Sequence, residues 1–85
     1  MMNQCIISVK QKTIYTSFLK VVKNGRMKIF DDKNKVICEK DFSDTNFFRM
    51  EAKIPSGKYS VLLLLDDQII TKTIAISHQS EARTN

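Results

Sequence analysis

In the segment 47–54, whose sequence is FFRMEAKI, apolar and charged residues alternate strictly from residue 48 onward. Every second residue over 48–54 is apolar, and the three residues between them are charged. Because successive side chains of a strand point to opposite faces, this period predicts a half-buried antiparallel strand. A helix would need apolar residues spaced by three and four, and this segment lacks that spacing.

Turn signals separate similar segments at intervals of about 8–12 residues, the spacing typical of a sandwich or barrel. These signals are Asn24-Gly25, the polar run 31–34, Pro55-Ser56-Gly57 and Asp66-Asp67. Asn24-Gly25 predicts a type I′ hairpin, since both residues tolerate positive φ. Gly57 permits a tight entry into the strand that follows it. We expect strands near residues 4–10, 14–23, 26–31, 35–41, 47–54, 58–65 and 68–76.

These elements predict an all-β fold, a small antiparallel immunoglobulin-like β-sandwich of about seven strands. A length of 85 residues leaves room for one domain and no second core. We expect the domain to cover residues 1–76 and a polar tail to cover residues 77–85. The strand order stays open, because Greek-key and meander connections produce the same alternation.

The chain offers few residues from which an active site could be built. His78 is the only histidine and lies in the polar tail. The two glycines are both explained by turns, so no glycine-rich phosphate loop exists. The pairs Asp31-Asp32 and Asp66-Asp67 lie in expected turns, where carboxylates bond nearby backbone amides. We therefore expect no enzyme activity, no cofactor and no metal site.

Two cysteines, Cys5 and Cys38, lie in apolar segments. Their spacing matches no zinc motif. The favoured interpretation is two reduced, buried thiols that act as small apolar residues. The alternative is one disulfide between strands, which would imply an oxidising compartment.

The positive charge of the chain is confined to its N-terminal third. Residues 1–28 contain six basic residues and no acid, whereas residues 29–85 contain eight basic and nine acidic residues. The six are Lys10, Lys12, Lys20, Lys23, Arg26 and Lys28. A field of one sign favours a polyanion or an acidic protein surface as partner, and the alternative is a solvated basic edge. Tyr15 and Phe18 lie among these residues, as aromatic side chains do in barrels that bind nucleic acids.

Residues 61–65 form an apolar run without alternation, which predicts a strand covered on both faces. The run consists of Val61, Leu62, Leu63, Leu64 and Leu65. Its second face could pack on a loop, on the tail, on another chain or on elements of the same domain. We expect an apolar partner contact here. The run is too short to span a bilayer, which takes about 20 residues in a helix.

The N-terminal sequence lacks the apolar stretch of a signal peptide. We therefore expect a cytoplasmic or virion-associated protein, or one at the cell surface if a leader has been removed.

The hexapeptide of residues 54–59, IPSGKY, followed by an apolar strand and a last strand with Lys72, resembles a known pattern. It is similar to the small β-sandwich modules of Bacteroidetes proteins, especially the C-terminal sorting domain of type IX secretion substrates. The resemblance covers about 50 residues, from 27 to 76. It implies a sandwich in which Tyr59 packs its ring inside and keeps its hydroxyl in water. A free-standing sandwich of this kind also resembles accessory or decoration proteins of bacteriophage capsids and tails.

Three functions follow from these observations. The first is a non-enzymatic structural or attachment module that docks on a larger assembly, such as a virion or a cell-surface assembly, through a protein partner or shell or as a homo-oligomer. The second is a sorting or anchoring domain of a secreted protein. The third is a nucleic-acid-binding β-barrel that uses the basic N-terminal third.

Overall fold

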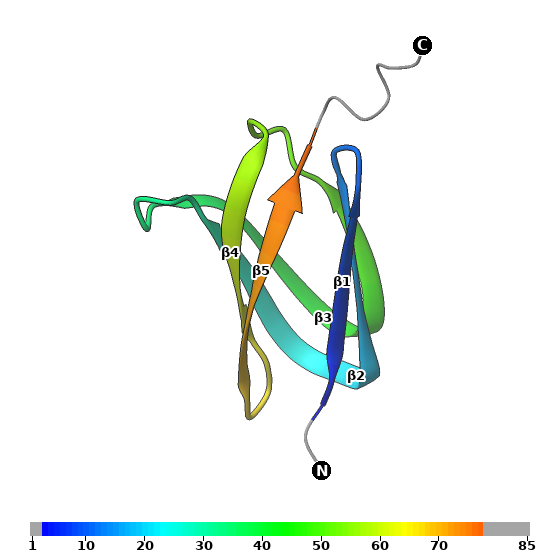
Figure 1. The fold of residues 1–85 in the computed structure, drawn as a ribbon. Coiled ribbons are helices and arrows are strands. Elements are labelled where there is room, and N and C mark those ends of the chain that lie inside the picture. Colours follow the sequence, from blue (N-terminus) through cyan, green and yellow to red (C-terminus); the bar gives the residue numbers. More distant parts are fainter. Residues whose placement is uncertain (1–2, 78–85) are drawn as a thin grey trace.

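The computed structural model describes residues 3–77, which form five strands in one curled antiparallel sheet (Figure 1). The all-β prediction is confirmed, with no helix in the described residues. The strands are β1 (Cys5–Lys10), β2 (Thr13–Phe30), β3 (Val36–Glu51), β4 (Gly57–Leu64) and β5 (Ile69–Ile76). Their order is β1-β2-β4-β5, and β3 pairs with β2 along its other edge.

Strands β2 and β3 are long and bent, so each of them contributes to two halves of the sheet. The first part of β2 pairs with β1 and with the end of β3, and its last part pairs with the start of β3 and with β4. We call β1 with residues 13–21 and 47–51 the β1 half. We call β4 and β5 with residues 22–30 and 36–45 the β4–β5 half. Figure 1 shows β2 and β3 sweeping together from one half to the other, so that the halves enclose a shared core.

The prediction of about seven strands is wrong in number, because two expected pairs of strands are continuous. The segments 14–23 and 26–31 belong to β2, and the segments 35–41 and 47–54 belong largely to β3. A register shift between Ser17 and Val22 accommodates the bend in β2. Bulges of this kind let one strand turn from one sheet face to another without a loop.

The predicted hairpin at Asn24-Gly25 is also wrong. Both residues lie inside β2, where they pair with Ser43 and Phe42 of β3. Gly25 is required there for space, because a Cβ atom on it would collide with the ring of Phe42. An aromatic ring laid across a facing glycine is a known way to keep a strand glycine paired.

Three other turn predictions are confirmed. The β2–β3 loop is closed by the Asp31 carboxylate, which accepts hydrogen bonds from the N–H groups of Lys33 (2.8 Å) and Lys35 (3.0 Å). The β4–β5 turn contains Asp66 and Asp67 and is closed by a bond from the Leu65 N–H to the Gln68 carbonyl at 2.9 Å. The third turn, residues 55–57, leads directly into β4.

For Tyr59, the sequence resemblance implies a buried ring and a hydroxyl in water, and the structure agrees only on the ring. Its ring is buried in the core, as expected. Its hydroxyl, however, donates a hydrogen bond of 2.5 Å to the carbonyl oxygen of Pro55 instead of pointing into water. Tyr59 thereby ties the start of β4 to the turn that precedes it.

The core is filled by apolar side chains from all five strands, with an aromatic cluster beside the bend in β2. Phe42 packs against Phe18 with ring centroids 5.6 Å apart and against Phe48 at 4.5 Å. Thr16 is the one polar residue that is fully buried in the described part of the chain. Its hydroxyl has no hydrogen-bond partner among these residues.

Two edge strands of the curled sheet, β1 and β5, approach each other at one end, where side chains next to them join them. Gln68 donates a hydrogen bond to the carbonyl of Asn3 and accepts one from the Asn3 N–H, both 2.9 Å long. The side chain of Asn3 in turn bonds the backbone N–H and carbonyl of Lys20, at the bulge where β2 has left its register. Two carboxamides therefore replace strand pairing at the place where the sheet closes.

Candidate interaction surface

Four large apolar side chains are exposed on the outer side of the β1 half. They are Ile6 (70% exposed), Leu19 (62%), Val21 (59%) and Phe47 (50%). We call these four residues the apolar outer face. Scattered single apolar residues are normal on protein surfaces, but a group of them indicates a contact site.

The strand register brings Ile6 and Phe47 into one row, and Leu19 and Val21 follow further along β2. Ile6 pairs with Ser17, and Ser17 pairs with Phe47, so these three residues form one row across β1, β2 and β3. Directly paired residues point to the same face of a sheet. Leu19 lies two positions beyond Ser17 on β2, and its N–H donates to the Gln4 carbonyl at 2.9 Å, which extends the pairing of β1 with β2. Val21 follows two positions later.

Each residue of the apolar outer face stands beside an apolar neighbour that points inward. Phe18, Val22 and Phe48 are buried in the core next to Leu19, Val21 and Phe47, and Ile7 packs against the core next to Ile6. Strand geometry forces one member of each doublet outward. These doublets are the sequence signal of the site, and the strand predictions did not use them.

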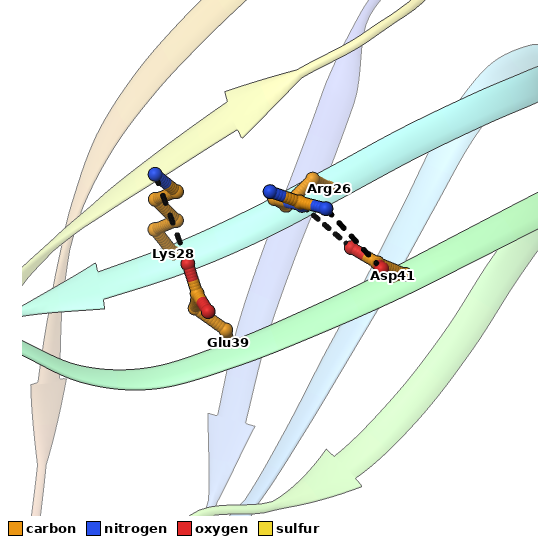
Figure 2. A network of polar contacts seen from close by, with 4 residues as sticks. All are labelled: Arg26, Lys28, Glu39 and Asp41. Atoms are coloured by element: carbon orange, nitrogen blue, oxygen red, sulfur yellow. Dashed lines mark hydrogen bonds and ion pairs between the residues drawn. The ribbon is translucent and has the colours of Figure 1, made fainter.

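Two of the six predicted basic contacts are neutralised by ion pairs on the β4–β5 half (Figure 2). The Arg26 Nε atom lies 2.7 Å from Asp41 Oδ1, and the Lys28 Nζ atom lies 3.7 Å from Glu39 Oε2. The hydrogen bond that Arg26 donates to the Asp41 carboxylate raises the pKa of Arg26 above its ordinary value. Both pairs join directly opposite residues of β2 and β3.

The other four predicted basic contacts fall into two groups. Lys10 and Lys12 lie at the β1–β2 hairpin, whereas Lys20 and Lys23 lie at the bend in β2. Lys20 lies eight residues after Lys12, and a strand rises about 3.3 Å per residue, so the two lysines are roughly 26 Å apart along β2. The six residues therefore do not form the single basic surface that their closeness in sequence suggests.

The predicted apolar contact at residues 61–65 is divided between the two faces of β4. Val61 and Leu63 are buried in the core, so they cannot contact a partner. Leu65 also packs against the core. Leu62 and Leu64 point outward and are half-buried, with Lys28 and Arg26 as their neighbours on β2. The run is thus explained mainly by the inside of the domain.

Of the two aromatic residues in the basic region, only Tyr15 is placed to meet a ligand. Phe18 is buried and packs against Phe42 and Phe48, so its ring cannot stack on a base. Tyr15 is half-buried on the outer side of the β1 half, paired with Ser8 and Arg49.

Both cysteines are free thiols, so the alternative of a disulfide is not realised in this structure. Burial raises the pKa of Cys5 and that of Cys38 above the ordinary value. A raised pKa leaves little of the reactive thiolate at neutral pH. No group of three or more potential metal ligands occurs within residues 3–77. His78 and the expected tail from residue 78 onward lie outside the described residues.

Comparisons with known proteins add no further assignment. No protein-family model matches the chain, and no curated protein is significantly similar to it. Within the described residues, no helix is long and apolar enough to cross a membrane.

Proposed function

We propose that the protein is a non-enzymatic attachment module that binds another protein through the apolar outer face. The curled sheet, with two halves packed on one core, suits the small immunoglobulin-like sandwich that the sequence suggested. In such a module the strands hold the binding surface in a fixed shape, and binding needs no catalytic group.

The exposure of Ile6, Leu19, Val21 and Phe47 on one side of one half is the observation that supports this proposal. The core is filled by other apolar side chains from all five strands, so these four residues are not needed to fill it. Exposing four large apolar side chains favours aggregation unless a partner covers them. The proposal explains why they stand together.

Docking on a virion or cell-surface assembly and sorting of a secreted protein are two settings in which such a module would act. Both stay proposals from the sequence resemblance. Nucleic-acid binding stays a prediction and gains no support from the geometry, because Arg26 and Lys28 are paired with acids and Phe18 is in the core.

The test is a position-resolved photo-crosslink in cells that naturally produce the protein. Benzoylphenylalanine replaces Phe47 in one chain and Ile69 in the control chain. Ile69 is 67% exposed, close to the 70% of Ile6, but it lies on β5. We expect one discrete adduct with another protein from position 47 and none from position 69. Equal adducts from both positions, or none from position 47, would contradict the proposal.

A further inference from the structure

We infer that the partner of the apolar outer face is an acidic protein segment, with apolar side chains next to a cluster of Asp or Glu. This inference rests on the proposed function and adds the chemistry of the partner. It is carried by the distribution of charge around the apolar outer face.

One end of the β1 half is strongly basic. Lys10 pairs with Thr13, and Thr13 pairs with Glu51 of β3. Arg49 lies on the same outer side, one row nearer to Ile6 and Phe47, and pairs with Tyr15. Lys12 lies in the β1–β2 turn, and its carbonyl accepts a hydrogen bond of 2.8 Å from the Ala52 N–H. This bond brings Lys53, the residue after Ala52, to the same end of the β1 half. We call Lys10, Lys12, Arg49 and Lys53 the basic end.

The charge of the basic end is not cancelled within the described part of the protein. Glu51 is the single acid among these rows, and no ion pair between residues 3–77 involves any of the four basic side chains. The β4–β5 half differs, since its outer ladder combines Arg26 with Asp41 and Lys28 with Glu39. The positive field therefore acts at the side of the apolar outer face and not over the whole molecule.

The opposite end of the apolar outer face is more balanced. Val21 and Lys20 border a hollow that is also lined by Asp66 and Asp67. A partner that spans the outer side of the β1 half would thus meet apolar side chains in the middle and positive charge at the hairpin. Complementary potentials of this kind fix the register of a complex and speed its formation.

A second copy of the chain fits this surface less well. Each copy carries a net charge of +5 and the same basic end, so two outer faces would bring like charges together. An acidic segment with apolar residues satisfies both parts of the surface at once. A self-associated dimer and an anionic lipid surface are kept as outcomes of the experiment.

The experiment titrates the ¹⁵N-labelled full chain with three synthetic peptides and follows its backbone amide signals. The first peptide joins alternating Leu and Phe to a cluster of four Glu. The second has Lys in place of each Glu, and the third keeps Glu but has Ser in place of each apolar residue. We expect the first to bind most tightly and to shift amides of β1, residues 13–21 and residues 47–51.

The test variant carries both Lys10→Gln and Arg49→Gln. The control variant carries Lys33→Gln, which lies in the β2–β3 loop. We expect the double change to weaken binding of the first peptide at least about fivefold and the control to leave it unchanged. Binding of the first peptide should also weaken with added salt, because the basic end is exposed.

The outcomes separate the two proposals. Equal binding of the Glu and Lys peptides overturns the acidic partner but leaves the apolar outer face as a protein-binding surface. Equal binding of the first and third peptides removes the role of the apolar residues and contradicts the proposed function as well. If the protein binds phosphatidylserine vesicles and does not respond to the first peptide, the inference is overturned in favour of a lipid surface. If sedimentation shows self-association that Ile6→Thr abolishes, it is overturned in favour of a second copy of the chain.

Discussion

At the scale of single residues, Thr16 places a polar hydroxyl group in the apolar core. The side chain is fully buried between Ile7 of β1 and Phe48 of β3, and its hydroxyl lacks a partner among the described residues. Burial of an unpaired hydroxyl costs about 1–3 kcal/mol.

Thr16→Val should therefore raise the free energy of unfolding, by about 1 kcal/mol in urea denaturation. Valine keeps the branched shape and β preference of threonine while it removes the unpaired group. The control is Thr13→Val, because Thr13 is only half-buried on the same strand, and its effect should stay within about 0.5 kcal/mol. A destabilised Thr16→Val chain would show that the hydroxyl is bonded in solution.

Gly25 belongs to a sequence pair that is typical of turns, but in this fold it makes room for an aromatic ring. The dipeptide Asn24-Gly25 is favoured in hairpins because of positive φ, but Gly25 is kept here because the Phe42 ring occupies the space of its Cβ. That ring packs against Phe18 and Phe48, so it cannot swing away without loss of contacts.

Gly25→Ala should lower the free energy of unfolding by about 1–3 kcal/mol through this overpacking. The same change in a chain that already carries Phe42→Ala should cost much less, because the ring is gone. The check is a double-mutant cycle by chemical denaturation. Equal losses in both backgrounds would mean that the strand conformation, and not the ring, selects glycine.

At the scale of elements, the bend in β2 is stabilised by the turn between β4 and β5. The Asp66 carboxylate accepts hydrogen bonds from the N–H groups of Lys23 (3.0 Å) and Asn24 (2.8 Å). These bonds lower the pKa of Asp66 below its ordinary value. A lowered pKa in the folded state stabilises the fold above the pKa of the unfolded chain, and the stabilisation is lost as the pH falls through the folded pKa.

Asp66→Asn should therefore destabilise the protein at neutral pH, because one acceptor oxygen and the charge are lost. The difference from the unchanged chain should shrink as the pH falls below about 4, where the unfolded carboxyl gains its proton. Thermal unfolding at a series of pH values measures it. Asp67→Asn is the control, since the Asp67 carboxylate has no backbone partner among the described residues. A difference that is constant with pH would contradict the role of the charge.

The elements also show which part of the fold can be read from sequence. The polar turns at residues 31–34 and 66–67 are predicted correctly, because hydrogen bonds between residues close in sequence stabilise them. The continuity of β2 and β3 could not be predicted. It depends on contacts between residues far apart in the chain, such as Gly25 with Phe42 and Lys20 with Asn3.

At the scale of the whole molecule, the candidate site follows from the fold and not from any motif. The basic residues of the N-terminal third and the apolar run 61–65 are the most evident features of the sequence, and the fold divides each of them between separate surfaces. The useful signal is the apolar doublets that contain Ile6, Leu19, Val21 and Phe47, since the two members of each doublet point to opposite faces of the sheet. Which member points outward depends on the register, so the doublets alone could not identify the face.

Two substitutions on the apolar outer face can separate an effect on binding from an effect on folding. Ile6 and Leu19 are exposed, so Ile6→Thr with Leu19→Thr should change the free energy of unfolding by less than about 0.5 kcal/mol each. The same two changes remove apolar contacts with a partner, each of which contributes on the order of 1 kcal/mol to binding.

Whether the apolar outer face is the binding surface can be decided by the yield of the position-47 crosslink in this double variant, measured together with its urea unfolding curve. We predict a yield at least about tenfold lower than in the chain with Ile6 and Leu19 intact, while the unfolding midpoint stays nearly the same. The Ile69→Thr chain should retain the full yield. An undiminished crosslink in a folded double variant would show that the apolar outer face is not the binding surface.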